Sequence, residues 1–584
     1  MTIKHSDLID YFKQRLLELY HTDTIDSYRV RHHNIVSILN ELSMIIEGWL
    51  EKSVKNFTTV ASCIEETVDL INSDSQFSYN CIEKENFVKM LLDFSKNLNT
   101  NSNNFDSYTG KYLVFIINKL LEHNSTIYFS NLWDAVEKVI FEDDTEINDQ
   151  NFIPSINVLD KLTTDLAREI LNKGFSKRSA FYHVKRFLVQ DNGIESFKDL
   201  RRYLSNDNEG NFIVIISTRL NDIKSKTVLN DFVSNLDLER LGINENLLDQ
   251  TKKNFIRNSE RRRFFIHKTK AIEAQTAVKK AKRVCQSRMD AFHLGASDIL
   301  IEIDDYAMVV QYDNNDKLIK IYLQPTNFPL DGKYANNTAL SNLYSSHIKK
   351  INKNNSIDPN TKIRIDGALR HLRMGNVEYE VEQKFINYWI ALEFIFSSPS
   401  IDQNTFNRLR ENLTNILAVS YVKRNFIHFE KVLRKKKLLN DNESLSKQNI
   451  DDIFNRTDDL LIKYRLKKFK SRLFIHKDKR KDYIIAHRKN LERHLIRIYH
   501  HRNLLIHEAA INQEIDDLTS NLRYYLVFLL EQMVRYFLST KQQNNSKQKG
   551  IEDFFYEYKM MYDYISTDWS LEKILSVPVF LNHS

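Results

Sequence analysis

The stretch YEVEQKFINYWIALEFIF, residues 379–396, is strongly apolar over its second half and is followed by Pro399. It is longer than an ordinary strand of roughly 3–10 residues, so it predicts a buried helix that ends before the proline. Apolar residues three and four apart also occur at Leu8–Leu19, Ile35–Leu50 and Tyr112–Leu121, a spacing typical of amphipathic helices. We therefore expect helices to dominate the fold.

Glycine and proline are scarce, at 11 and 6 among 584 residues. Strand-and-turn architectures use both residues, so their scarcity favours long helices joined by polar loops. A chain of this length exceeds what one core supports. We expect a mainly α, multi-domain protein with four parts: a helical sensor or scaffold region (1–250), a basic helix with a small β-sheet (251–345), a C-terminal helical bundle (346–545), and a linker with a short tail (546–584).

A β signal interrupts the helices in the middle of the chain. Three short runs rich in β-branched residues, Asp298–Ile303, Tyr306–Tyr312 and Lys317–Leu323, are divided by Asx-rich turns. This pattern predicts a small antiparallel sheet of two or three strands. One further strand-like run lies earlier, at Phe212–Ile216, whereas the basic segment Lys252–Arg288 predicts a long helix or a helix pair.

Basic and acidic residues are unevenly distributed, although the net charge is only +7. The first part of the chain, to about Gln150, is neutral to acidic, with clusters such as Glu65–Glu66, and basic runs follow later, including 434–437 and 463–481. Such runs form a solvated helix face or attract a phosphate backbone. Three basic regions in one part of the chain favour a polyanion partner. The candidate RNA-binding residues are Arg261, Arg262, Arg263, Lys279, Lys280, Lys282 and Arg283.

The cysteines and the N-terminus indicate a reducing compartment. Cys63, Cys81 and Cys285 are far apart and form neither a disulfide framework nor a zinc pattern. The first residues lack the apolar core of a signal peptide, and no apolar run is long enough to cross a bilayer. We expect a cytoplasmic protein without a membrane partner. No phosphate-binding glycine loop or acidic metal cluster is evident, so we expect no cofactor and no metal site.

The segment YHHRNLLIH, residues 499–507, combines groups that suit phosphodiester chemistry. On a helix of 3.6 residues per turn, Arg502 falls within an apolar stripe, while His500, Asn503 and His507 share a second face. Histidine moves protons near neutral pH, and the permanently charged arginine offsets charge on a phosphate. Cleavage of RNA needs no metal by this route, because the 2′-hydroxyl is the nucleophile. The plain alternative is a surface helix whose Arg and His face water.

Three features in order carry a resemblance to a known family. Residues 502–507, RNLLIH, match the Arg-Asn-three-residues-His signature of the HEPN superfamily. Residues 389–393, WIALE, resemble the Trp-Ile-Ala-Leu-Glu helix of Apea-like HEPN domains, and residues 366–370, DGALR, resemble the short helix that precedes it there. The resemblance covers about residues 363–538, although the insertion between Phe396 and Asn490 is long for a compact HEPN bundle.

The resemblance implies a HEPN-type helical bundle with ribonuclease activity, in which two motifs from paired chains share one cleft. Carried over, His507 is the acid/base and Arg502 contacts the phosphate. Asn503 orients His507 or the phosphate. His500 is a further candidate proton carrier. Glu393 is our own inference as the partner of Arg502, because a carboxylate on a largely apolar helix needs a counter-charge; an exposed helix position is its alternative.

Near-copies of the motif occur at Arg263–His267, Arg424–His428 and Arg472–His476, each one residue shorter than the signature. The pair Arg262 and His267 has the right length, but Arg263 replaces the Asn. We interpret these copies as basic amphipathic helix segments, some of them in contact with RNA. A second motif at Arg262 and His267 would allow a cleft within one chain.

We expect an endoribonuclease of anti-phage abortive infection, acting as a homodimer or larger assembly on tRNA, rRNA or mRNA. A phage-derived trigger would release it, with the N-terminal half holding it inactive or sensing the invader. The main alternative is a non-catalytic HEPN-like scaffold that binds RNA or nucleotide in a defence system. A third hypothesis is a DNA-binding regulator that uses the basic helices.

Overall fold

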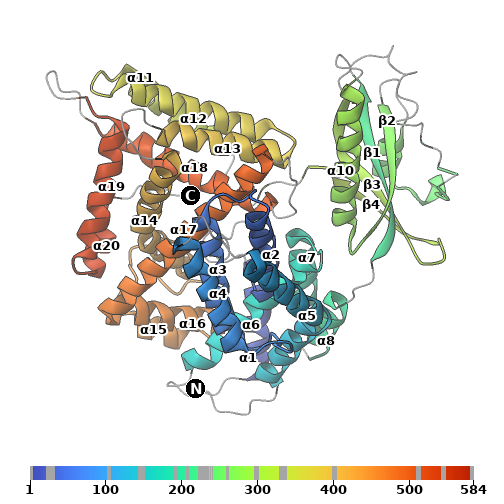
Figure 1. Ribbon diagram of the computed structural model, residues 1–584, viewed down its shortest axis with the longest axis horizontal. Coiled ribbons are helices and arrows are strands. Elements are labelled where there is room, and N and C mark those ends of the chain that lie inside the picture. The colour runs from blue at the N-terminus through green and yellow to red at the C-terminus, as the bar shows by residue number, and fades with distance from the viewer. Residues whose placement is uncertain are drawn as a thin grey trace. The chain divides into compact units, whose positions relative to one another are not determined.

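The computed structural model describes most of the chain. The described residues are 4–21, 33–100, 107–141, 152–189, 194–205, 209–220, 236, 238–239, 241–257, 262–294, 301–327, 330, 338–397, 404–507, 515–540 and 548–578. Within them the chain forms twenty α-helices and one four-stranded antiparallel sheet (Figure 1). The predicted mainly α fold with a small antiparallel β element is therefore confirmed.

The chain separates into two units that differ from the expected division. Unit 1 comprises Met1–Leu166 and Leu330–Ser584, and unit 2 comprises Ala167–Pro329. The N-terminal helices therefore belong with the C-terminal helices and not to a region ending near residue 250. None of the described helices combines the length and the apolar character needed to cross a membrane.

The N-terminal helices of unit 1 include the three predicted runs Leu8–Leu19, Ile35–Leu50 and Tyr112–Leu121, which lie in the first, second and fifth helices. Their caps are specified locally: the Asn34 side chain accepts from the Ser37 amide at 3.0 Å, and that of Asn56 accepts from the Thr58 amide at 3.0 Å. The helices are α1 (His5–Tyr20), α2 (Ile35–Leu50), α3 (Phe57–Ser73), α4 (Lys84–Thr100), α5 (Ser107–Phe141) and α6 (Phe152–Asn172), the last of which continues into unit 2.

The C-terminal helices of unit 1 surround one large apolar core. They are α11 (Thr338–Lys353), α12 (Pro359–Val377), α13 (Val381–Phe396), α14 (Thr405–Lys435), α15 (Ile450–Arg456), α16 (Leu460–Phe469), the π-helical turn η3 (Lys470–Ile475), α17 (Lys477–His507), α18 (Ile515–Leu538), α19 (Ile551–Ser566) and α20 (Leu571–Ser576). The opening stretch of the sequence forms α13, whose Phe385, Trp389 and Leu392 are buried in this core. Its apolar character follows from this burial.

Residues 546–584 are not a linker and short tail over their described part. They form α19 and α20, and Phe555 of α19 stacks on Phe396 with ring centroids 5.0 Å apart. Phe554 and Ile574 are fully buried in the same core. The expectation was wrong because it extended the polar character of the run before Gly550 to the residues after it, which form an amphipathic helix.

Unit 2 holds the sheet. Its elements are α7 (Lys177–Val189), α8 (Ile194–Leu204), β1 (Gly210–Leu220), η2 (Glu245–Leu247), α9 (Gln250–Ile256), β2 (Arg262–Ala271), α10 (Ala274–His293), β3 (Ile301–Tyr312) and β4 (Leu318–Pro325). The strand order is β2-β1-β3-β4, and every neighbouring pair is antiparallel. In Figure 1 α10 lies along one face of the sheet.

The strands correct two expectations. The strand-like run Phe212–Ile216 lies in β1, an inner strand, since Val214 packs beneath α10 while Ile215 packs on the opposite face. The described part of the two runs 298–303 and 306–312 belongs to one strand, β3. The basic segment Lys252–Arg288 is not a long helix. It contains most of α9, all of β2 and most of α10, because Phe264 and Phe265 are buried on the sheet.

Candidate active site

The candidate motif lies at the C-terminal end of the long helix α17. Leu495 and Ile498 of this helix are fully buried in the C-terminal core, whereas Arg502 and Asn503 are half-buried. His507 is the last residue of α17, and its side chain lies outside the described residues. The apolar stripe of the helix thus places Arg502 at the border between core and surface.

Arg502 contacts the carboxylate that the sequence suggested as its partner. Its Nη2 atom donates to Glu393 Oε1 of α13 at 3.3 Å, and its Nη1 atom donates to Asn503 Oδ1 at 3.2 Å. The indole of Trp389 donates to the same Glu393 oxygen at 2.6 Å. Glu393 is therefore held by two donors, and the ion pair expected between Glu393 and Arg502 is present.

The Nε atom of Arg502 is buried and has no hydrogen-bond partner among the described residues. A buried donor without a partner is costly, and such groups are uncommon in folded proteins. The Nε–H is enclosed by the protein, so a ligand would meet the exposed part of the Arg502 side chain, which is 22% exposed as a whole.

His500 does not lie open to a substrate. Its side chain is buried, and burial, with a smaller contribution from Arg497, lowers its pKa to about 4. The neighbouring His501 is also buried, and burial, His500 and Arg497 lower its pKa to about 3. Both are uncharged at neutral pH. The burial of His500 argues against its role as a further proton carrier, which the sequence left open.

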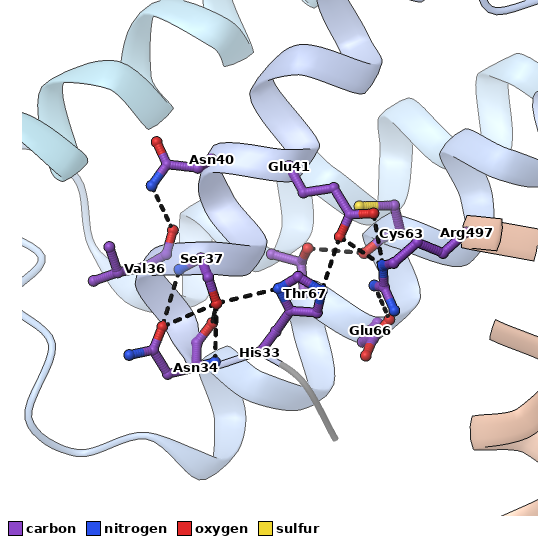
Figure 2. Close-up of polar contacts among 10 residues, drawn as sticks. All are labelled: His33, Asn34, Val36, Ser37, Asn40, Glu41, Cys63, Glu66, Thr67 and Arg497. Carbon is purple, nitrogen blue, oxygen red and sulfur yellow. Dashed lines mark hydrogen bonds and ion pairs between the residues drawn. The ribbon is translucent and has the colours of Figure 1, made fainter. Parts of the chain in front are cut away.

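Arg497 is a buried cation that the sequence reasoning missed. Its Nε atom lies 2.7 and 3.0 Å from the two carboxylate oxygens of Glu41 on α2, and its Nη2 atom lies 2.7 Å from Glu66 on α3. Figure 2 shows its side chain extending from α17 between these two helices. Burial alone would lower the pKa of Arg497, but Glu41 and Glu66 raise it above its usual value.

The surroundings of Arg497 are polar and ordered. His33 Nε2 lies 3.3 Å from Glu41, and its Nδ1 contacts the Ser37 hydroxyl at 3.1 Å (Figure 2). Burial, followed by the charge of Glu41, raises the pKa of the Cys63 thiol beside them. The Glu65–Glu66 cluster and the spacing of Arg493 and Arg497 by one helical turn were the signals that could have revealed this contact.

A cleft of about 550 Å³ lies between α3, α14 and α17. Lys489 and Arg493 line it from α17, Arg410 lines it from α14, and Phe57 lines it from the first turn of α3. The acids Glu65, Glu411 and Glu492 line it as well. The cleft therefore exposes part of the cationic side of α17.

The candidate RNA-binding residues lie in unit 2, away from the motif in the chain. Arg261 is outside the described residues, whereas Arg262 and Arg263 lie on the strand β2. Arg262 Nη2 is 3.3 Å from Asp304, and Arg262 Nη1 donates to the Phe255 carbonyl at 3.1 Å. Arg262 therefore has structural partners of its own.

The other members of this set lie on α10. They are Lys279, Lys280, Lys282 and Arg283. Lys280 lies 3.1 Å from Glu209, and Lys282 donates to Asn327 at 2.8 Å. Arg283 is exposed. Lys280 also donates to the Lys270 carbonyl of β2 at 2.7 Å, so Lys280 and Lys282 both have structural partners of their own.

The near-copies of the motif occupy unlike structures. Arg263–His267 lies in β2, so it is not the amphipathic helix that we expected, and its alternating side chains cannot present a helical motif. Arg424–His428 lies in α14, where Arg424 lies over the Phe528 ring at 4.7 Å. Arg472–His476 lies in and directly after η3. Strand geometry thus argues against a second motif at Arg262 and His267.

No group of three or more His, Cys, Asp or Glu side chains in the described part of the chain is arranged to hold a metal ion. Comparisons with protein-family models, with curated proteins and with solved structures found no match to this chain.

Proposed function

We propose that this protein is a metal-independent endoribonuclease of the HEPN type, which cleaves cellular or phage RNA in the cytoplasm during anti-phage abortive infection. One observation carries the proposal: Arg502 is paired with Glu393, bonded to Asn503, and lies on the same helix as His507. Residues 503 and 507 are one helical turn apart and so share a face.

The reaction needs only groups of this chain and of the RNA. His507 takes the proton of the ribose 2′-hydroxyl, whose oxygen attacks the adjacent phosphorus. The bond from phosphorus to the 5′ oxygen breaks, and that oxygen receives a proton from a histidine. The products are a 2′,3′-cyclic phosphate and a 5′-hydroxyl. Arg502 offsets the charge that develops on the phosphate oxygens.

The contacts of Arg502 suit this role. Glu393 fixes the guanidinium from one side, and Trp389 fixes Glu393 in turn. The Arg502 side chain is 22% exposed, so the part of it that faces solvent can meet a phosphate oxygen. A guanidinium held in place before the substrate arrives loses little conformational freedom on binding.

We further propose that two chains pair so that both motifs face one cleft, as the resemblance to HEPN domains implies. A second His507 would then serve as the acid while the first serves as the base. Release from an inactive state by a phage-derived trigger completes the proposal.

The test compares RNA from cells that express the wild type, His507→Ala or Arg502→Ala, with tRNA, rRNA and mRNA resolved and with phage challenge. The exposed His476 belongs to a near-copy of the motif, so His476→Ala is the matched control. We expect fragments ending in 2′,3′-cyclic phosphate with the wild type and the control only. Identical RNA profiles, growth and protection for all variants would contradict catalysis. RNA bound but uncleaved by the purified wild type would favour the non-catalytic scaffold.

A further inference from the structure

The contacts between the N-terminal helices and α16–α17 are segregated by charge. The ion pairs are Glu18–Arg465, Asp160–Lys468, Glu65–Lys489, Glu65–Arg493, Asp69–Arg493, Glu41–Arg497 and Glu66–Arg497. In each of these pairs the acid comes from residues 1–166 and the base from α16 or α17. We call the six acids the acidic cover and the five bases the basic face.

In the described part of the chain, the apolar core of the C-terminal helices is formed without residues of the N-terminal helices that carry the acidic cover. Among the described residues, every member of that core, including the partly buried ones, lies at or after Leu330. Two aromatic pairs link the layers, Tyr11 with Tyr464 at 5.7 Å and Phe152 with Phe454 at 6.1 Å. Leu460, Leu461 and Tyr464 of α16 are buried outside that core, so apolar contacts also contribute to the attachment. The ion pairs are the part of the attachment that a polyanion can replace.

Burial of the charges around Arg497 is a poor way to gain stability. The side chain of Arg497 is 5% exposed and those of Glu41 and Glu66 are 10% and 14% exposed. Removing such groups from water costs about as much as their attraction returns, and well-packed apolar residues serve stability equally well. Charge complementarity instead provides specificity for a partner of opposite sign.

The basic face has the geometry of a backbone-binding surface. Lys489, Arg493 and Arg497 follow one another at one-turn intervals, about 6 Å apart along the axis of α17. His507 lies about 15 Å beyond Arg497 on the same helix. A row of cations that leads to a catalytic group positions a phosphate chain without reading its sequence.

The cleft between α3, α14 and α17 supplies the opening to this row. Lys489 and Arg493 line it, so the row is partly accessible with the cover in place. Phe57 at the cleft is 45% exposed, an unusual position for a large aromatic side chain. An exposed ring beside cations is the arrangement on which single-stranded bases stack.

We propose that the basic face of α16 and α17 binds the phosphate backbone of single-stranded RNA, and that the acidic cover occupies it as an intramolecular substitute for phosphates. RNA is chosen as the occupant because the row leads to the proposed ribonuclease motif, so the inference rests on the proposed function. An RNA strand enters at the cleft, displaces Glu65 and Asp69 from Arg493, and runs along α17. The cover therefore limits RNA access until it is displaced.

The first experiment measures binding in the full-length protein with the cleavage motif disabled. In a His507→Ala background, a fluorescein-labelled single-stranded RNA of about 20 nucleotides is titrated at several KCl concentrations and followed by anisotropy. The test variant adds Glu65→Gln, Glu66→Gln and Asp69→Asn. We expect at least tenfold tighter binding and a steeper dependence on salt, because freed cations neutralise more phosphates. The matched control is Glu47→Gln with Glu85→Gln, two exposed acids of the N-terminal helices that face elsewhere.

Two further variants make the result specific. Adding Lys489→Gln and Arg493→Gln to the cover variant should abolish the gain in affinity. If the cover variant does not fold, hydrogen exchange of the His507→Ala protein replaces it: RNA should slow exchange in α17 and hasten it in α3. Unchanged affinity in a folded cover variant, or unchanged exchange in both helices, would overturn the inference.

The experiment separates this inference from the proposed function. RNA that binds as expected but is cleaved equally by the wild type and His507→Ala would contradict the nuclease and leave the surface intact. If the wild type cleaves RNA but the cover variant binds RNA no more tightly than the control variant, the RNA-binding role of the basic face is contradicted and the nuclease is not. Equal affinity for a duplex DNA of the same length would contradict single-stranded RNA as the occupant. So would displacement of the labelled RNA by an acidic peptide but not by unlabelled single-stranded RNA.

Discussion

The carboxylate of Glu393 on α13 lies 3.3 Å from the guanidinium of Arg502 on α17, although 109 positions separate the two residues in the sequence. Their side chains are 34% and 22% exposed, so the pair lies at the edge of the core and not within it. A pair in this position contributes little to stability. Its main effect is to fix the direction in which the guanidinium points.

Glu393→Gln should therefore lower the rate of RNA cleavage by about tenfold through misplacement of Arg502, while unfolding free energy changes by less than about 1 kcal/mol. Single-turnover cleavage and denaturant titration measure the two effects. Asp451→Asn, which removes an exposed partner of Lys470, is the control and should alter neither. A loss of stability that matches the loss of activity would contradict an orienting role.

Arg497→Met should destabilise the attachment of the N-terminal helices by about 3 kcal/mol, since it leaves Glu41 and Glu66 buried without their counter-charge. Hydrogen exchange in α2 and α3 should become faster, with α18 unaffected. Adding Glu41→Gln and Glu66→Gln should restore most of the protection. Equal exchange in the wild type and Arg497→Met would show that this buried pair does not hold the layers together.

His500 and His501 should make the protein sensitive to acid. Their pKa values are lowered to about 4 and about 3, mainly by burial, from 6.5 in the unfolded chain. Their contribution to stability is thus fully present above pH 6.5 and is lost as the pH falls toward 4, by up to about 2.7 kcal/mol per pH unit. The unfolded chain binds the two protons first.

Tryptophan fluorescence can follow this loss, because Trp49, Trp133, Trp389 and Trp569 all lie in unit 1. Urea midpoints at pH 7.5, 6 and 5 should fall steadily for the wild type and less steeply for His501→Phe. The exposed His476 provides the control, as His476→Ala should retain the wild-type slope. A slope unchanged by His501→Phe would mean that this histidine is not responsible.

Two glycines of α12 should respond to alanine with opposite signs. A Cβ at Gly375 would lie 2.5 Å from the buried Tyr388 ring of α13, so Gly375→Ala should destabilise by about 1–3 kcal/mol. A Cβ at Gly367 would meet only the rim of Phe394 at 3.0 Å, and that ring is 40% exposed and can move. Gly367→Ala should gain about 0.5–1 kcal/mol from helix propensity. Thermal denaturation of the pair checks both signs.

Local sequence patterns were sufficient for most helices and for the strand positions β1, β3 and β4, but not for β2. The apolar run at 379–396 became α13, and the run at Phe212–Ile216 became β1, because side-chain period and burial agree there. The prediction of a helix over the basic segment Lys252–Arg288 was wrong. Its charges suggest a helix, but Phe264 and Phe265 lie in β2, which pairs with β1, a strand distant in the sequence. Strand pairing is a non-local choice that such a segment does not encode.

The sequence by itself determined the helical class, the position of Arg502, Asn503 and His507 on one helix, and Glu393 as a carboxylate in need of a cation. These follow from periodicity and from the cost of burying a lone charge. Only the tertiary structure decided that Arg497 is enclosed by Glu41 and Glu66, and that His500 is buried instead of open. The contacts of Arg497 join segments more than 400 positions apart, and the burial of His500 depends on how the helices pack, so no local pattern contains either.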